Sequence, residues 1–294
     1  MTTAQLDTPV VSRRFWSGMT LLVCALLVAP MVASQLGGNY WVRVIDFALL
    51  YVMLALGLNI VVGYTGLLDM GFIAFYAVGA YLAALLASPH LLDVFPILNS
   101  WFPDGLHTSW LVIIPLAALA AAGCGIVLGA PTLKLRGDYL AIVTLGFGEI
   151  IRILMRNLDR PVNITNGAKG ISGVDSLNLF GLKFSRIGRA WHAIREDEDV
   201  ARAMGINLRN YKLLAFAIGA SFGGVAGALF GAFQGFVSPE SFTLQESIAV
   251  LAMVVLGGMG HIPGVILGAV LLTALPELLR SQAAPVQQAL FGEV

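Results

Sequence analysis

The chain contains no lysine or arginine between Val44 and Leu133. A water-soluble domain has charged residues at about a quarter of its positions, whereas this chain is 12% charged and 58% hydrophobic. Apolar runs of about 20 residues can cross the hydrocarbon core of a bilayer as helices. Because lipid offers the backbone no hydrogen-bond partners, such runs must be helical. The sequence therefore predicts an all-α, polytopic membrane protein.

Windows of about 19 residues predict spans of one transmembrane domain that covers residues 1–294. The first apolar run follows Arg13 and Arg14 and could be read as an export signal, but its length favours a spanning helix. The spans are expected near 15–34, 44–62, 66–87, 109–130, 138–155, 211–233, 244–260 and 263–279.

The placement of basic residues predicts the orientation, because basic loops remain on the cytoplasmic side. The double arginine at 13–14 places the N-terminus inside. The loop 88–109 has no basic residue and fits the outer face, and Lys134 with Arg136 marks a return to the cytoplasm. The next span leads the polar stretch 157–183 outside.

The predicted alternation of loops between the cytoplasmic and the outer side fails before the most charged part of the chain. Residues 186–212 contain 10 of the 34 charged residues, six of them basic, and belong inside. The apolar stretch 174–184 has about half the length of a span. Either the loop 157–183 is re-entrant, or a spanning segment is missing between about Phe184 and Arg186. We favour the missing segment.

The charged stretch 186–212 has the pattern of a helix on the membrane surface, in which the run 195–199 faces water. Gly205 is expected to end this helix, and Asn207 or Asn210 to begin the next. The apolar stripe consists of Ile187, Trp191, Ile194, Val200, Ala203 and Met204.

Periodicity alone leaves two interpretations of this helix. It is either an interfacial connection between two spans or a docking helix for a cytoplasmic motor subunit. In the second interpretation Gly188, Trp191 and Gly205 shape the contact.

The run GRAWHAIREDEDVARAMGI at 188–206 resembles the cytoplasmic coupling motif of the permease subunits of bacterial ABC importers for branched-chain amino acids, of the LivM type. Other runs agree, namely GYTGLLDMGFIAFYAVGAY at 63–81, LRGDYLAIVTLGFGEI at 135–150 and TNGAKGI at 165–171. The similarity extends from about residue 40 to residue 280, and the coupling run is its most specific part.

The resemblance implies the fold of an ABC importer permease in the bacterial inner membrane. It also implies a homologous second permease, two cytoplasmic ATPases and a periplasmic substrate-binding protein as partners. Closure of the ATPases would push on a coupling segment at 186–209. In this family one more span precedes the coupling motif, and a final helix follows the position of Val294. The residues expected to make or orient the contact are Gly188, Arg189, Trp191, Arg195, Glu196, Asp197, Asp199 and Gly205.

Rows of glycine recur at intervals of four residues in two predicted spans. Such rows let helix backbones approach closely where no hydrophobic effect drives association. Helices that slide during transport would also suit them, but packing is the favoured interpretation. The rows are Gly219, Gly223, Gly227 and Gly231, then Gly260, Gly264 and Gly268.

Ionisable groups inside spans are costly unless they are paired or solvated. Glu149 and Arg152 lie three residues apart and are expected to pair with each other. Asp69 lies in the stretch 63–71, bounded by glycines, which could be a broken helix that exposes backbone groups to a substrate. For Asp69 a helix cap and a place on the pathway remain equally open.

An amino acid needs donors for its carboxylate, an acceptor for its ammonium and an apolar slot. Thr65, Gly66 and Asp69 are the candidates for the polar part, and Phe72, Phe75 and Tyr76 for the apolar wall.

Other functional classes lack support in the sequence. There is no G-x-x-x-x-G-K-[ST] loop, so ATP and Mg²⁺ are expected at partner ATPases and no cofactor on the chain itself. No His/Cys cluster suggests a metal site, no catalytic motif suggests an enzyme, and a net charge of zero argues against nucleic acid. The alternatives are a carrier driven by an ion gradient, with Asp69 or Glu149 as its coupling carboxylate, and an ABC permease for urea or amides.

Overall fold

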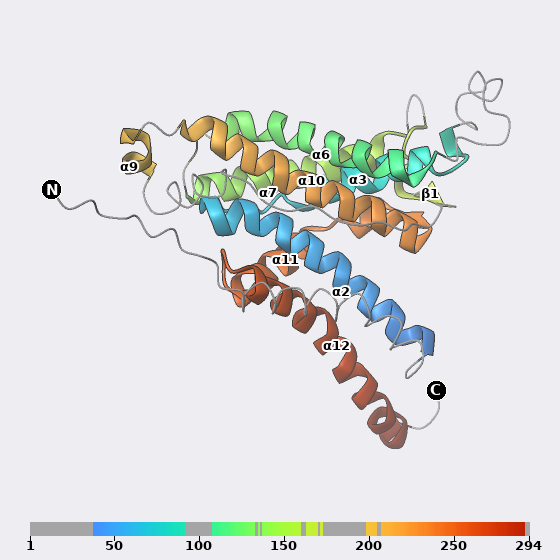
Figure 1. Ribbon diagram of the computed structural model, residues 1–294. Coiled ribbons are helices and arrows are strands. Elements are labelled where there is room, and N and C mark those ends of the chain that lie inside the picture. Colours follow the sequence, from blue (N-terminus) through green and yellow to red (C-terminus); the bar gives the residue numbers. More distant parts are fainter. Residues whose placement is uncertain are drawn as a thin grey trace. The chain divides into compact units, whose positions relative to one another are not determined.

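A computed structural model describes residues 38–91, 108–132, 135, 137–159, 163–169, 171–172, 198–204 and 207–291 (Figure 1). Its helices are α2 (Gly38–Asn59), the π-helix η1 (Ile60–Tyr64), α3 (Ile73–Leu86), α6 (Trp110–Thr132), α7 (Asp138–Asn157), α9 (Glu198–Ala203), α10 (Leu208–Gln234), α11 (Leu244–Gly257) and α12 (Ile262–Phe291). The short elements are the 3-10 turns η2 (Gly167–Lys169) and η3 (Pro239–Ser241) and the strands β1 (Ile171–Ser172) and β2 (Phe236–Val237), which pair antiparallel. The prediction of an all-α bundle is confirmed.

Five described segments are long and apolar enough to cross a membrane. Large apolar side chains on them lie exposed, such as Leu119 at 69% and Val127 at 70% on α6. An exposed apolar surface of this extent is typical of a face in contact with lipid. The chain is therefore a multi-pass membrane protein. The five segments are Tyr40–Tyr64, Trp110–Thr132, Leu208–Gln234, Pro239–Gly257 and Ile262–Arg280.

Three predicted spans differ from the observed helices in extent or polarity. The one expected at 263–279 continues as α12 to Phe291. The span expected at 66–87 becomes helical only at Ile73, because Gly66 has a φ of +69° and the backbone leaves the helix there. α7 covers the span expected at 138–155 but is too polar to be one of the five apolar segments. The span expected at 15–34 lies outside the described residues.

The chain divides into two compact units, one formed by residues 1–49 with 273–294 and the other by residues 50–272. In the first unit the Tyr40 hydroxyl of α2 donates a hydrogen bond to Glu277 Oε1 of α12. The second unit contains the rest of the described elements and the candidate site.

The core of the second unit forms where α10 packs against α3 and α6. A Cβ atom on Gly227 would lie 2.0 Å from the carbonyl oxygen of Tyr76 in α3, and one on Gly224 would lie 2.5 Å from that of Ala117 in α6. Gly219 meets Gly57 of α2, whose carbonyl oxygen would lie 2.9 Å from an added Cβ. The absence of side chains at these positions lets the helix backbones touch.

The second glycine row acts in the same way between α11 and α12. A Cβ atom on Gly264 would lie 1.9 Å from the carbonyl oxygen of Gly257, and one on Gly268 would lie 2.6 Å from that of Met253. Gly260 has a φ of +83° and belongs to the turn between the two helices.

The two ends of α10 contact different parts of the chain. At its first residues, Leu208 and Tyr211 pack with Ala201 of α9. Directly after its last turn, β2 pairs with β1, so that Ile171 faces Val237 (Figure 1). Residues 172 and 198 therefore lie at opposite ends of a helix of 27 residues, which is about 40 Å long.

Candidate functional site

The candidate site begins where the helix formed by α2 and η1 breaks. The hydroxyl of Thr65 donates to the carbonyl oxygen of Val61 at 2.6 Å, and Gly66 then turns the backbone out of the helix. The side chain of Asn59, which is 1% exposed, fixes the break by accepting a hydrogen bond from the Gly260 amide at 2.8 Å. A π-helical turn and a break of this kind often mark functional positions in helices.

The broken segment 66–72 lies against α7. A Cβ atom on Gly71 would lie 2.0 Å from the carbonyl oxygen of Thr144, so only glycine permits this approach. The amide of Met70 donates to Thr144 Oγ1 at 3.0 Å, and that hydroxyl donates to the carbonyl oxygen of Ala141 at 3.1 Å. Thr144 thus holds the non-helical backbone that lipid could not satisfy.

Asp69 lies at the centre of this segment and is 2% exposed. Its Oδ1 accepts a hydrogen bond from the Gly71 amide at 2.8 Å, next to the start of α3. Its Oδ2 is buried and has no hydrogen-bond partner among the described residues. One oxygen therefore stabilises the turn before α3. The N-cap of α3 is Phe72 and has no side-chain cap hydrogen bond, so the helix-cap interpretation of Asp69 is not confirmed. The side chain of Thr144 also lies close enough to the carboxylate to stabilise it.

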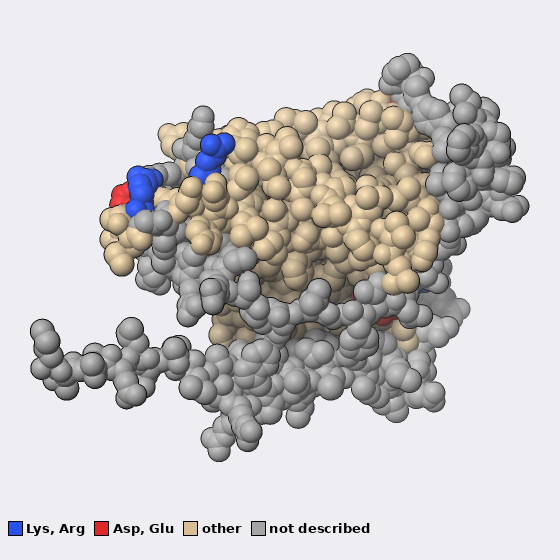
Figure 2. Space-filling model, turned by 45° about the horizontal axis from the view of Figure 1, so that its top comes forward, with Lys and Arg blue, Asp and Glu red and all other residues tan. Residues whose placement is uncertain are grey.

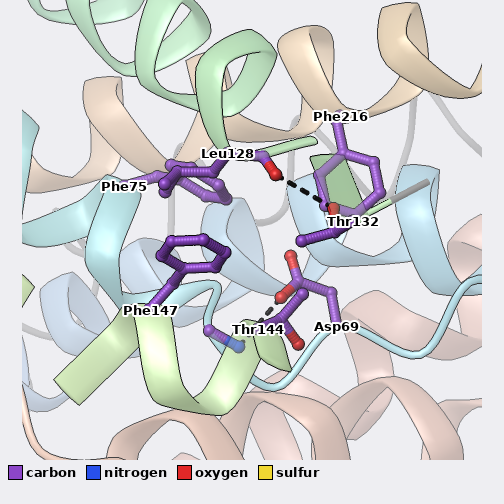
Figure 3. A pocket seen from close by; sticks show the side chains of 8 residues that line it. Asp69, Phe75, Leu128, Thr132, Thr144, Phe147 and Phe216 are labelled. Carbon is purple, nitrogen blue, oxygen red and sulfur yellow. Dashed lines mark hydrogen bonds between the residues drawn. The ribbon is translucent and has the colours of Figure 1, made fainter. Parts of the chain in front are cut away.

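A cavity of about 10 Å³ adjoins Asp69 (Figure 3). Its walls come from the broken segment and from α3, α6, α7 and α10, all within the second unit. Figure 3 shows the Asp69 carboxylate directed toward Thr132, with Phe75 and Phe147 on one side and Phe216 on the other. The lining residues are Asp69, Gly71, Phe75, Leu128, Thr132, Thr144, Phe147 and Phe216.

The structure brings two of the six predicted pathway residues, Asp69 and Phe75, into this cavity. Phe72 packs its ring edge-on against Phe75, with 5.9 Å between the ring centres. Tyr76 belongs to a different cluster, with Phe230 and Phe242.

Thr65 and Gly66 shape the break and do not line the cavity. The sequence interpretation did not identify Leu128, Thr132, Thr144, Phe147 and Phe216. Two of these, Thr132 and Thr144, lie on either side of the basic turn at Lys134 and Arg136, Thr132 at the end of α6 and Thr144 about two turns inside α7. A hydroxyl at the end of the apolar run that forms α6 was the available signal for Thr132.

The predicted pair of Glu149 and Arg152 on α7 is confirmed. Arg152 donates to Glu149 with both Nε, at 3.1 Å, and Nη2. Glu240 of η3 lies 3.9 Å from Arg152 and 3.6 Å from Arg156, so the end of α7 connects to the loop after α10. These side chains lie away from the lining of the cavity.

Residues 198–204 and 207–209 are the described part of the predicted coupling segment, and they include α9. On the face shown in Figure 2, the charged side chains of the described residues gather mainly at this end, and the surface over α6 is uncharged. Asp199 and Arg202 pair at 3.4 Å, and Val200 and Met204 are 59% and 78% exposed. Gly188, Arg189, Trp191, Arg195, Glu196, Asp197 and Gly205 lie outside the described residues.

Asn207 begins α10, as expected. Its side chain accepts a hydrogen bond from the Asn210 amide at 3.3 Å. The described residues contain no group of three or more His, Cys, Asp or Glu side chains that could hold a metal ion.

Comparisons with known proteins agree with this architecture. The family model described as "Branched-chain amino acid transport system / permease component" matches residues 40–180 and 177–293. The permease protein LivM of the Escherichia coli high-affinity branched-chain amino acid transport system is 42% identical, over 88% of this chain and 68% of the relative. The probable LivM of Methanocaldococcus jannaschii is 28% identical over 74% of this chain and 75% of its own length.

A second kind of permease is also similar. LivH of the same Escherichia coli system is 25% identical over 76% of this chain and 79% of the relative. No solved structure matches the chain. Since the family model covers most of the sequence, the chain belongs to the family of permease components of branched-chain amino acid transport systems.

Proposed function

We propose that the chain is the membrane-spanning permease subunit of an ATP-driven importer for branched-chain amino acids in a bacterial inner membrane. The observation that supports this most is its 42% identity to LivM over 88% of its length. The five apolar spans and the break at Gly66–Phe72 agree with a transport role, because non-helical backbone at membrane depth is tolerated only where it is buried or lines a path.

The proposed partners supply what this chain lacks. The similarity to LivH supports pairing with a homologous second permease. ATP and Mg²⁺ would bind to two cytoplasmic ATPases, and a periplasmic protein would deliver the amino acid. This chain contributes the path through the bilayer and the contact that receives the movement of the ATPases.

The coupling contact is proposed at residues 186–209, with the eight residues Gly188 to Gly205 named above as its members. Two described features support it. Val200 of α9 and Met204, directly after it, present exposed apolar side chains that a partner subunit could cover. Ala201 of α9 packs on Leu208 and Tyr211, so a force on α9 is transmitted to α10.

The proposed orientation has a cytoplasmic N-terminus and places α9 in the cytoplasm. Residues 172 and 198 lie at opposite ends of α10, and the 25 residues between them include seven charged ones. A span tolerates few charges, which supports the proposal that a spanning segment is missing near 184–186. The alignment to LivM has 309 positions, and about 259 of them, 88% of 294, contain a residue of this chain. About 50 positions of the alignment therefore have no residue from this chain.

The broken segment and α3 are proposed to line the substrate path. Asp69 and Phe75 line a cavity, which supports their place on it. We also propose a place on this path for four further residues, Thr65, Gly66, Phe72 and Tyr76.

A pull-down from native membranes in mild detergent tests the assembly. The tagged protein should recover ATPases with a P-loop and a second permease.

The double charge reversal Glu196→Lys with Asp197→Lys should lower ATP-dependent leucine uptake strongly while ATP hydrolysis continues, because the contact that links uptake to hydrolysis is lost. The matched control is Asp93→Lys with Asp104→Lys, which makes the same two reversals on the loop expected outside.

Retention of full coupled uptake by the 196/197 variant would remove these residues from the coupling contact. Recovery of the chain alone, with leucine uptake in vesicles that lack ATP, would replace the proposal with a carrier driven by an ion gradient. Uptake of urea in place of leucine would assign the chain to the related amide permeases.

A further inference from the structure

The cavity beside Asp69 presents an unpaired acceptor. Asp69 is 2% exposed, and its Oδ2 has no hydrogen-bond partner among the described residues. The turn before α3 holds the other oxygen in place through the Gly71 amide at 2.8 Å. A buried carboxylate with a free oxygen is stabilised most by an adjacent positive charge.

The other side chains that line the cavity are apolar apart from the hydroxyls of Thr132 and Thr144. Thr132 Oγ1 donates to the carbonyl oxygen of Leu128 at 3.0 Å, which leaves its lone pairs free to accept. Phe75, Phe147 and Phe216 line the cavity with aromatic rings, whose faces attract a nearby cation (Figure 3). Among the described residues, no lysine or arginine lines the cavity.

The size of the cavity limits what enters it. A volume of about 10 Å³ is close to that of one water-sized group. An entire amino acid does not fit in this conformation, whereas a single ammonium group does.

The place of the cavity in the fold connects it to the coupling segment. Thr132 is the last residue of α6, and Phe216 lies eight residues after the start of α10, about two turns from Leu208. Leu208 packs on Ala201 of α9. A displacement of α9 therefore reaches the Phe216 wall through a short length of continuous helix.

We propose that this cavity receives the α-ammonium group of the amino acid near the cytoplasmic end of its path, with Asp69 Oδ2 and Thr132 Oγ1 as acceptors. The inference rests on the proposed function and adds a chemical role to it, because Asp69 would bind the ammonium group of the substrate. The side chain and the carboxylate of the amino acid remain outside the cavity until the helices move.

Competition binding tests the inference without any variant. Radiolabelled L-leucine is bound to the assembled complex in detergent, without ATP and without the binding protein. We expect 3-methylbutylamine, which has the ammonium and the alkyl chain but no carboxylate, to displace leucine, and 4-methylpentanoate, which has no ammonium, to fail. Equal displacement by both compounds, displacement by the carboxylate alone, or no leucine binding to a transporting complex would overturn the inference.

Two variants locate the site. Asp69→Asn keeps the acceptor for the Gly71 amide and should weaken leucine binding about tenfold or more, because an uncharged amide replaces the partner of the ammonium. Thr132→Val should weaken it by a smaller factor. The control Asp138→Asn makes the same chemical change at an exposed position of α7 and should leave binding unchanged. Where Asp69→Asn does not assemble, Thr132→Val and the competition experiment decide.

Two further outcomes separate this inference from the function on which it rests. Absence of ATP-driven leucine uptake by the wild-type complex in proteoliposomes refutes the proposed function. Uptake that persists unchanged in Asp69→Asn refutes only the cavity inference. Leucine binding that needs sodium and is lost in choline chloride would assign the cavity to a metal cation and overturn the ammonium site.

Discussion

At the scale of single residues, glycines set how closely α10 approaches its neighbours. Gly224 and Gly227 face backbone atoms of α6 and α3 at distances that no Cβ could share, and a Cβ on Gly223 would lie 3.1 Å from Phe75 Cβ, a tight contact. The spacing of four residues in the sequence predicted such a row. The sequence did not reveal that Gly224, outside the row, faces a second helix, because the rotation of α10 against two neighbours is a tertiary property.

Gly227→Ala should destabilise the bundle. The new Cβ would lie 2.0 Å from the Tyr76 carbonyl oxygen, and the resulting displacement of α3 from α10 costs about 1–3 kcal/mol. The measurement is the midpoint of thermal unfolding in detergent. Gly123→Ala on α6 is the control, since its Cβ would meet nothing within 4 Å and its midpoint should not fall. Equal midpoints for the two variants would contradict the packing assigned to Gly227.

The candidate site shows how far residue patterns reach. Asp69 could be selected because a carboxylate inside an apolar run needs a reason, and Phe75 because it follows on the same stretch. Thr132, Phe147 and Phe216 come from three other helices and become neighbours only through helix packing. The separation of these residues along the sequence does not indicate that they are neighbours in the fold.

At the scale of elements, the junction of α9 and α10 depends on its cap. Asn207→Ala removes the acceptor for the Asn210 amide and should cost about 1 kcal/mol at the start of α10. Hydrogen–deuterium exchange of the amides at 208–215 should become faster. Asn207→Asp retains the acceptor and should exchange like the wild type, as should Asn210→Ala, whose side chain does not form this cap. Unchanged exchange in Asn207→Ala would show that packing alone holds the junction.

The hydropathy of the sequence predicted the positions of the helices well, but it did not predict where a helix breaks. The bounds of α6 and α10 differ from the predicted spans by a few residues, because long apolar runs leave little choice. The run at 66–87 is equally apolar on average, yet its first part is not helical. Gly66, with its positive φ, and Asp69, which bonds the Gly71 amide, stabilise the break, and a window average cannot register either contact.

At the scale of the whole molecule, the positions of β1 and α9 at opposite ends of α10 predict that Ser172 and Asp199 lie on opposite sides of the membrane. Single cysteines at these positions, in a background without Cys24 and Cys124, test this. A thiol reagent that cannot cross the membrane should label position 172 in intact cells and position 199 only after permeabilisation.

Labelling of both positions from the same side would support a re-entrant loop in place of a missing span. A separate check is peptide sequencing of the protein expressed from its gene. A peptide that reads continuously from Gly181 to Gly188, as written here, would also contradict the missing segment.

The length of α10 has a mechanical consequence. It is an uninterrupted helix of 27 residues, held at one end by α9 and at the other by the β1–β2 pair. A rod about 40 Å long that pivots at one end by about 5° moves its other end by roughly 3 Å. That displacement is close to the width of a methyl group, so a small tilt imposed at the α9 end would produce an opening at the β1–β2 end without any helix having to unfold.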